Sequence, residues 1–228
     1  MFTGPHIIID GLILHLDAAN IKSYPRSGTT WNDLSRKSIN GSLLNGPLFS
    51  SANNGSIVFD GVNDRVECNE VSAFKISSTI TLHASFYINN YVNWAGIVGR
   101  NNDSKSVYAL NLSPNSQRLR FNYNNISPWT TNIETTSTLP IRQWIISTVT
   151  YDGTDVKMYL NGVLDRVATI GSITFDTGSG FPLDIGYDNP GGDEYFNGNI
   201  SQILIYNRAL TQQEVLQNYN ATKGRFNL

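Results

Sequence analysis

The sequence has little that would cross-link the chain, insert it into a membrane or attract nucleic acid. It holds one cysteine, Cys68, so no disulfide can form within the chain and the fold must rest on its core. Its 16 basic and 18 acidic residues leave a net charge of −2, which provides no electrostatic footprint for nucleic acid. No apolar run reaches membrane-spanning length, and the start MFTGPHIIID lacks the basic and long apolar segments of a signal peptide. We expect no nucleic-acid partner, no membrane insertion and no passage through a secretory pathway.

Helical periodicity is scarce as well, and short alternating runs bounded by turn residues take its place. The 228 residues, 40% of them hydrophobic, can bury the core of one all-β domain. Evenly spaced strands with polar turns predict a β-sandwich or barrel. The expected strands are residues 7–16, 56–59, 80–88, 95–99, 108–112, 119–123, 144–151, 156–160, 163–169, 183–187 and 200–206.

The clearest local signal is the stretch RQWIISTVTYDGTDVKMYLNGVL, residues 142–164. Two alternating strands flank a turn at Asp152-Gly153, and Asn161-Gly162 predicts a two-residue type I′ hairpin because both residues tolerate positive φ. The stretch holds no group suited to catalysis, and we expect Trp144 to be a core residue.

The two ends of the chain differ from its middle. After the first strand, residues 18–54 are rich in Asn, Ser, Gly and Pro, and predict mainly loops. We therefore divide the chain into an N-terminal extension, 1–54, anchoring or packed on the sandwich, and a sandwich domain, 55–228. Near the C-terminus, Thr211 and Glu214 form a capping box, and Leu210 and Val215 a hydrophobic staple, so a short helix is expected there.

Five blocks in order resemble the laminin-G-like, concanavalin-A-like lectin/glucanase family: SIVFDGVNDRV (56–66), ITLHASFYI (80–88), QWIISTVTYDG (143–153), MYLNGV (158–163) and YFNGNISQILIYNRAL (195–210). The resemblance implies an all-β jelly-roll sandwich of two antiparallel sheets. Its members mostly bind carbohydrate or protein, and some are glycosidases. The segment LILHLDAANIKSYPRSGTTWNDLS, residues 12–35, also resembles structural proteins of tailed bacteriophages, which implies a virion setting.

Catalytic constellations are hard to find in the sequence. Glucanases of this fold place two carboxylates on one strand, roughly 5 to 10 Å apart across the scissile bond. Glu67 and Glu70 fall on opposite faces of a strand, and Asp193-Glu194 lies in a Gly-rich loop, so solvated surface acids are the favoured interpretation. We predict a protein that is not an enzyme.

The turn DGVND offers a candidate metal site through Asp60, Asn63 and Asp64. Calcium requires six to eight oxygen ligands, and relatives in the family hold calcium near the sheet rim. Alternatively, these residues form turns by bonding to their own backbone. The turn interpretation is favoured, because the segment supplies few carboxylates. No cofactor is required, and calcium is the one ion whose binding the sequence leaves open.

Sugar binding uses flat aromatic faces together with amide and carboxylate partners for hydroxyl groups. Aromatic residues that lie among Asn, Pro and Gly, outside the alternating runs, are better candidates than those in the strands. The candidate ligand-binding residues are Tyr91, Trp94, Trp129, Tyr187, Asn189, Asp193 and Tyr195.

Three functions follow as hypotheses. The first is a non-catalytic module that binds a glycan or polysaccharide and is displayed on a phage virion, as a capsid decoration or tail-associated protein. The second is a purely structural virion protein without a ligand, and the third is a glycoside hydrolase or lyase. For the first two, the expected location is the virion surface, and the expected partners are capsid or tail subunits and further copies of the chain, because weak lectin sites gain strength by multivalency.

Overall fold

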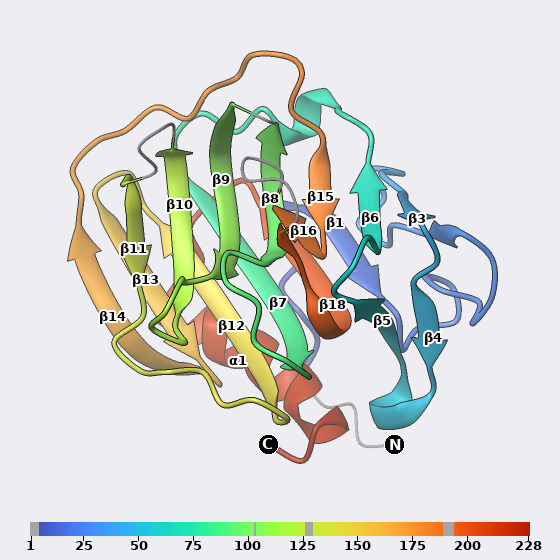
Figure 1. Cartoon of the computed structure of the whole chain (residues 1–228). Coiled ribbons are helices and arrows are strands. Elements are labelled where there is room, and N and C mark those ends of the chain that lie inside the picture. Colours follow the sequence, from blue (N-terminus) through green and yellow to red (C-terminus); the bar gives the residue numbers. More distant parts are fainter. Residues whose placement is uncertain (1–4, 103, 126–129, 189–193) are drawn as a thin grey trace.

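The computed structural model describes residues 5–102, 104–125, 130–188 and 194–228. Two antiparallel sheets of eight strands each face one another, and a small two-stranded sheet accompanies them. We call the two large sheets sheet A and sheet B; Figure 1 shows sheet B in front of sheet A. This arrangement confirms the predicted all-β jelly-roll sandwich.

Sheet A is built around the ten-residue strand β18, which pairs with β7 on one side. On its other side, the first half of β18 pairs with β5 and the second half with β1. The strands of sheet A in spatial order are β14 (Val163–Thr169), β13 (Asp155–Leu160), β12 (Trp144–Tyr151), β7 (Ile80–Ile88), β18 (Asn197–Tyr206), β5 (Ser56–Asp60) and β4 (Leu48–Ser50), with β1 (Leu12–Asp17) beside β18.

Sheet B holds the other eight strands, and the small hairpin β16–β17 adjoins it through contacts of β16 with β8. The strands of sheet B in order are β11 (Asn132–Glu134), β10 (Leu119–Asn125), β9 (Lys105–Leu112), β8 (Gly96–Asn102), β15 (Leu183–Ile185), β6 (Arg65–Cys68), β3 (Gly41–Leu44) and β2 (Thr30–Trp31). The hairpin consists of β16 (Tyr187–Asp188) and β17 (Glu194–Tyr195).

The core lies between the sheets, where the alternation of each strand directs its apolar side chains inward. At its centre, Phe196 packs edge-to-face against Phe59 and Phe86, with ring centroids 6.3 and 6.2 Å apart. Cys68 is a free, fully buried thiol in this core, as expected of a single cysteine.

The predicted hairpin and helix are confirmed. Asn161 and Gly162 have φ values of 50° and 77° and connect β13 to β14. Helix α1 (Gln212–Thr222) begins at the Thr211 capping box, in which the Thr211 side chain accepts from the Glu214 amide and the Glu214 side chain accepts from the Thr211 amide. At eleven residues, α1 is a short helix, as the pattern predicts. None of the described helices is long and apolar enough to cross a membrane.

The outer face of sheet A is also covered, by α1 and the 3₁₀ turn η4 (Lys223–Arg225) that follows it. Trp144 is buried here rather than between the sheets, with its ring stacked 4.4 Å from that of Phe226. His83 lies on the same outer face of sheet A and is fully buried, because α1 and the turn after it exclude solvent from this face. Its Nδ1 forms a hydrogen bond with the hydroxyl of Thr148.

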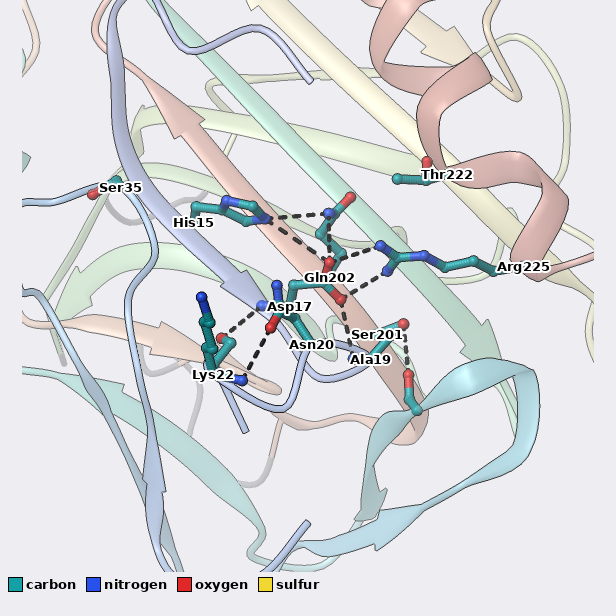
Figure 2. A network of polar contacts seen from close by, with 12 residues as sticks. His15, Asp17, Ala19, Asn20, Lys22, Ser35, Ser201, Gln202, Thr222 and Arg225 are labelled. Atoms are coloured by element: carbon teal, nitrogen blue, oxygen red, sulfur yellow. Dashed lines mark hydrogen bonds and ion pairs between the residues drawn. The ribbon is translucent and has the colours of Figure 1, made fainter. Parts of the chain in front are cut away.

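An ion pair ties the first strand to the C-terminus. Asp17, at the end of β1, accepts hydrogen bonds of 2.7 and 2.8 Å from the two terminal nitrogens of Arg225, as Figure 2 shows. Gln202 of β18 donates to the same carboxylate at 3.3 Å, and Nε2 of His15 lies 4.0 Å from Oδ2 of Asp17. Asp17 is 3% exposed, so these hydrogen bonds take the place of contacts with water.

Residues before 55 contribute strands to both sheets. β1 and β4 join sheet A, while β2 and β3 join sheet B. The boundary at residue 54 stays a prediction, but strands from both sides of it share the same two sheets.

Candidate functional site

The candidate site lies on the outer face of sheet B, the face turned away from the core. In β9 and β10, Leu110 and Phe121 point into the core, so the alternate residues Asn111 and Arg120 lie on the outer face. The register places Arg120 beside Asn111 on one side and beside Glu134 of β11 on the other. The alternation that builds the core therefore also aligns a row of polar side chains across three neighbouring strands.

The hairpin β16–β17 adjoins this face next to β8 (Figure 1). A Cβ on Gly96 would lie 2.2 Å from the carbonyl carbon of Tyr187, so only glycine allows the hairpin backbone to approach β8 this closely. Tyr187 and Tyr195, which pair across the hairpin, stack with their ring centroids 4.5 Å apart. The hairpin thus brings two acidic residues, Asp188 and Glu194, to the polar row, and it carries the two stacked tyrosine rings beside them.

Buried carboxyl groups dominate the electrostatics of the site. Asp188 is 3% exposed and accepts a 2.5 Å hydrogen bond from Nδ2 of Asn111. Burial raises the pKa of Asp188 to about 6, and burial together with the nearby Asp188 raises the pKa of the half-buried Glu194 to about 8. Burial also raises the pKa of Asp184, on neighbouring β15, to about 7. Near neutral pH Glu194 therefore holds a proton and can donate as well as accept hydrogen bonds, whereas Asp188 is mainly ionised.

Arg120 joins the acidic groups to an aromatic side chain. Its guanidinium lies 4.5 Å above the ring centroid of the half-buried Trp94, a cation–π contact. Burial lowers the pKa of Arg120, while the neighbouring charges of Glu134, Asp188 and Glu194 oppose that shift. Trp94 has a left-handed backbone, with φ of 66°, and its amide donates to the carbonyl of Leu112 at 3.0 Å. The Trp94 backbone is thus fixed by Leu112, and its ring is fixed by Arg120.

The structure pairs two of the predicted ligand-binding residues directly, because Tyr187 stacks on Tyr195 in the hairpin. Trp94 lies against Arg120, whose charge also interacts with Glu194 of the same hairpin. Tyr91 has a different role: its hydroxyl donates to the carbonyl of Ser113 at 2.6 Å and fastens its loop. Trp129, Asn189 and Asp193 lie outside the described residues.

Sequence reasoning missed the polar half of the site. Asn111 and Arg120 alternate with core residues in β9 and β10, a signal that was present but is shared by every solvated strand. The predicted solvation of Glu194 holds only in part, because the hairpin register places this half-buried side chain opposite the buried Asp188.

Stability is expected to fall as the pH rises through the titration of Glu194. In the unfolded chain this carboxyl has a pKa near 4.5 and in the folded chain about 8, so the folded protein holds an extra proton between these values. Its stabilising contribution is complete below about pH 4.5 and is lost as the pH rises through 8. We expect the thermal midpoint of Glu194→Gln to decline less between pH 5 and 9 than that of the unmodified protein.

Glu214→Gln is the matched control for this measurement. The ion pair with Arg208 holds the pKa of Glu214 at about 2, so this replacement removes no titration between pH 5 and 9. Equal slopes for Glu194→Gln and the unmodified protein would contradict the assignment of the raised pKa to Glu194.

The predicted calcium turn bonds to itself. Oδ1 of Asp60 accepts from the amides of Val62 and Asn63, at 2.8 and 3.3 Å, and Oδ2 of Asp64 accepts from the amide of Asp60 at 3.0 Å. Within the described ranges, no group of three or more acidic, histidine or cysteine side chains is placed to hold a metal ion. The donor set fits a self-bonded turn and not a tight calcium site.

Solved structures share the fold of this chain at low sequence identity. The binding domain of Paraclostridial Mosquitocidal Protein 1 matches with a TM-score of 0.71 and 16% identity over 93% of this chain and 52% of that one. Domain 4 of AbnA, a GH43 extracellular arabinanase from Geobacillus stearothermophilus solved with arabinotriose, matches with a TM-score of 0.69 and 17% identity over 91% of this chain and 98% of that one.

A third match is a botulinum neurotoxin type C structure whose description states that cell entry depends on interaction with two ganglioside molecules. Its TM-score is 0.69, with 14% identity over 94% of this chain and 52% of that one. This chain therefore spans about half the length of the mosquitocidal-protein and neurotoxin chains. A search of the curated proteins found no match.

The family comparison agrees with the fold. The laminin G model described as the concanavalin A-like lectin/glucanases superfamily matches residues 60–216, from the end of β5 into α1. The match covers well over half of the chain and includes β6, the polar row and the hairpin β16–β17. The chain belongs to the concanavalin A-like lectin/glucanase superfamily.

Proposed function

We propose that this protein binds carbohydrate without cleaving it, on the outer face of sheet B beside the hairpin β16–β17. The observation that carries the proposal is the half-buried Trp94 against the guanidinium of Arg120, together with the hairpin that brings Glu194 near Arg120 and carries the stacked rings of Tyr187 and Tyr195. Aromatic faces suit the C–H groups of a sugar ring, and the charged groups beside them suit its hydroxyls. The arabinotriose complex and the ganglioside dependence of two similar folds support this choice.

The arrangement favours a weak and shallow site. The accessible groups are Trp94, Glu194 and Tyr195, while Asn111 and Asp188 lie beneath them, almost fully buried. The buried groups hold the accessible ones in position and limit the cost of ordering them on binding. A site of this kind gains useful strength when many copies act together.

The test is a glycan array with Trp94→Ala and Tyr195→Ala. Each replacement is expected to weaken binding about tenfold, because each removes an aromatic face worth about 1 kcal/mol or more to a stacked ring. Val62→Ala, at a side chain that is 67% exposed on another turn, is the control and is expected to bind as the unmodified protein does. If a variant that combines Trp94→Ala with Tyr195→Ala binds glycans as the unmodified protein does, this face is not the site. If the unmodified protein binds no glycan at all, a purely structural role is favoured.

A phage virion is the setting proposed for this activity. The resemblance of residues 12–35 to structural proteins of tailed phages supports it, and so does the need for many copies. Immunogold labelling of purified particles is expected to place the protein on the capsid or tail surface. Its absence from washed particles would leave carbohydrate binding in place and remove the virion setting.

Glycoside hydrolysis is the second candidate, favoured by one observation. Glu194 is half-buried, has a pKa of about 8 and pairs in register with the buried Asp188. A protonated acid beside a second carboxyl is the pairing that glycosidases use. If the protein is a glycosidase, a panel of chromogenic glycosides will show turnover that is lost in Glu194→Gln; binding without turnover supports the non-catalytic module.

A further inference from the structure

A second cleft lies at the end of the sandwich where β1 and β7 begin and β18 ends. Its volume is about 650 Å³, within the range of roughly 300 to 1,000 Å³ that is typical of small-molecule sites. It shares no residue with the polar row or the hairpin β16–β17. Its floor is formed by side chains that belong to the core, Ile13, Ile39 and Ile76.

The polar wall of the cleft consists of hydrogen-bond donors and positive charge. It is made of Lys37, Lys75, Asn207 and four serines, Ser38, Ser72, Ser77 and Ser78. Among the described residues that line it, none is acidic. Lys75 has partners of its own at the rim, with its ammonium 3.5 Å from Glu70 and 3.0 Å from the hydroxyl of Ser179. Within the described part of the chain, the Lys37 ammonium has no hydrogen bond or ion pair.

The loop that carries Lys37 is held rigidly although its backbone is strained. Arg36 and Ser38 both have left-handed backbones, with φ values of 70° and 57°, a conformation that costs non-glycine residues about 1 kcal/mol or more. Asp33 compensates by accepting hydrogen bonds on both sides of the loop, from the amide of Ser35 at 2.8 Å and from that of Ile39 at 3.2 Å. Lys37 therefore stands at the cleft on a fastened loop and not on a free one.

We propose that this cleft binds a small organic anion, such as a sugar that bears a carboxylate or a sulfate. Lys37 and Lys75 would lie beside the anionic group of the ligand, and the serine hydroxyls and the Asn207 amide would donate hydrogen bonds to its oxygens. The isoleucine side chains would contact the apolar face of the sugar ring. The lack of an acidic side chain in the lining favours an anion over a neutral sugar or a cation. With no aromatic ring in the lining, recognition depends on charge and must weaken with salt.

The experiment is an NMR titration of ¹⁵N-labelled protein with three probes of similar size: glucuronate, glucose 6-sulfate and glucose. The two anions are expected to shift the amide signals of residues 37–39 and 72–78. Raising the salt concentration from low to physiological ionic strength is expected to weaken the binding of both anions severalfold. Glucose is expected to leave these amides unchanged. If only one anion binds, the proposal stands and the charged group is identified.

Lys37→Met and Lys75→Met are each expected to weaken anion binding at least fivefold, and Lys22→Met, at another exposed lysine, is the matched control. Lys37 is exposed and has no partner within the described part of the chain, so its replacement is expected to leave the thermal midpoint unchanged. The proposal is overturned if glucose binds here as tightly as the anions, if neither anion binds, or if Lys37→Met binds normally while it remains folded. None of these results depends on the carbohydrate site on sheet B.

Discussion

Phe196→Ala is expected to destabilise the protein by about 3 to 5 kcal/mol, because it leaves a phenyl-sized cavity at the centre of the core. The ring is fully buried and packs edge-to-face on Phe59 and Phe86, so the surrounding side chains cannot collapse into the space without losing these contacts. For a domain of this length the thermal midpoint should fall by about 10 °C. Urea unfolding measures the free energy directly, with an unchanged m-value as the sign that the unfolded state is unaffected.

The same replacement is expected to disturb the candidate site. Phe196 directly follows β17, and its amide donates to the carbonyl of Gly186 at 2.9 Å. Its buried ring therefore fixes to the core the hairpin that carries Tyr187 and Tyr195. Phe196→Leu keeps much of the volume and is expected to cost less than half as much. Should Phe196→Ala unfold at the same urea concentration as the unmodified protein, the packing described for the core would be wrong.

Arg225→Met is expected to cost about 2 to 3 kcal/mol, because it leaves the Asp17 carboxylate buried without its charged partner. Breaking a fully buried pair costs roughly 3 to 5 kcal/mol, and the value expected here is smaller because the Arg225 side chain is 25% exposed and Gln202 still donates to Asp17. Methionine retains most of the aliphatic contact of the arginine. The effect should therefore come from the lost ion pair and not from lost packing.

A double-mutant cycle isolates the pair. In Asp17→Asn combined with Arg225→Met, no charge is left buried, so the double variant should be more stable than the sum of the two single effects predicts. We expect a coupling energy of about 2 kcal/mol from urea unfolding of the four proteins. Strict additivity would show that the C-terminal turn is held by Phe226 and α1 without help from this ion pair.

Local features were predictable because their causes lie within a few residues. The positive φ values at Asn161 and Gly162 need only those two residues, and the capping box needs only Thr211 and Glu214. The strands followed from alternation, and the order of five blocks was enough to indicate the family and the sandwich. Residues 18–54 were less predictable, because their short strands are stabilised by pairing and not by their own pattern: β4 pairs with β5, β3 with β6, and β2 with β3.

The candidate site was only partly predictable. Its aromatic members stood out because Trp94, Tyr187 and Tyr195 lie among turn-forming residues. Its polar members did not, because the alternation that places Asn111 and Arg120 on an outer face is the same for a solvated face and for a binding face. Similarly, the sequence placed Trp144 correctly in a buried position, but not on the outer face of sheet A beneath Phe226.

The sequence by itself determined the all-β class, the sandwich, the central hairpin and the capped helix, because alternation, turn chemistry and capping act over short distances along the chain. Only the tertiary structure decided which charges are withdrawn from water. Asp17 meets Arg225 across 208 residues, and Asn111 meets Asp188 across 77. Burial and pairing of this kind depend on which strands become neighbours, and they decide the raised pKa values of the hairpin acids and the ion pair at the C-terminus.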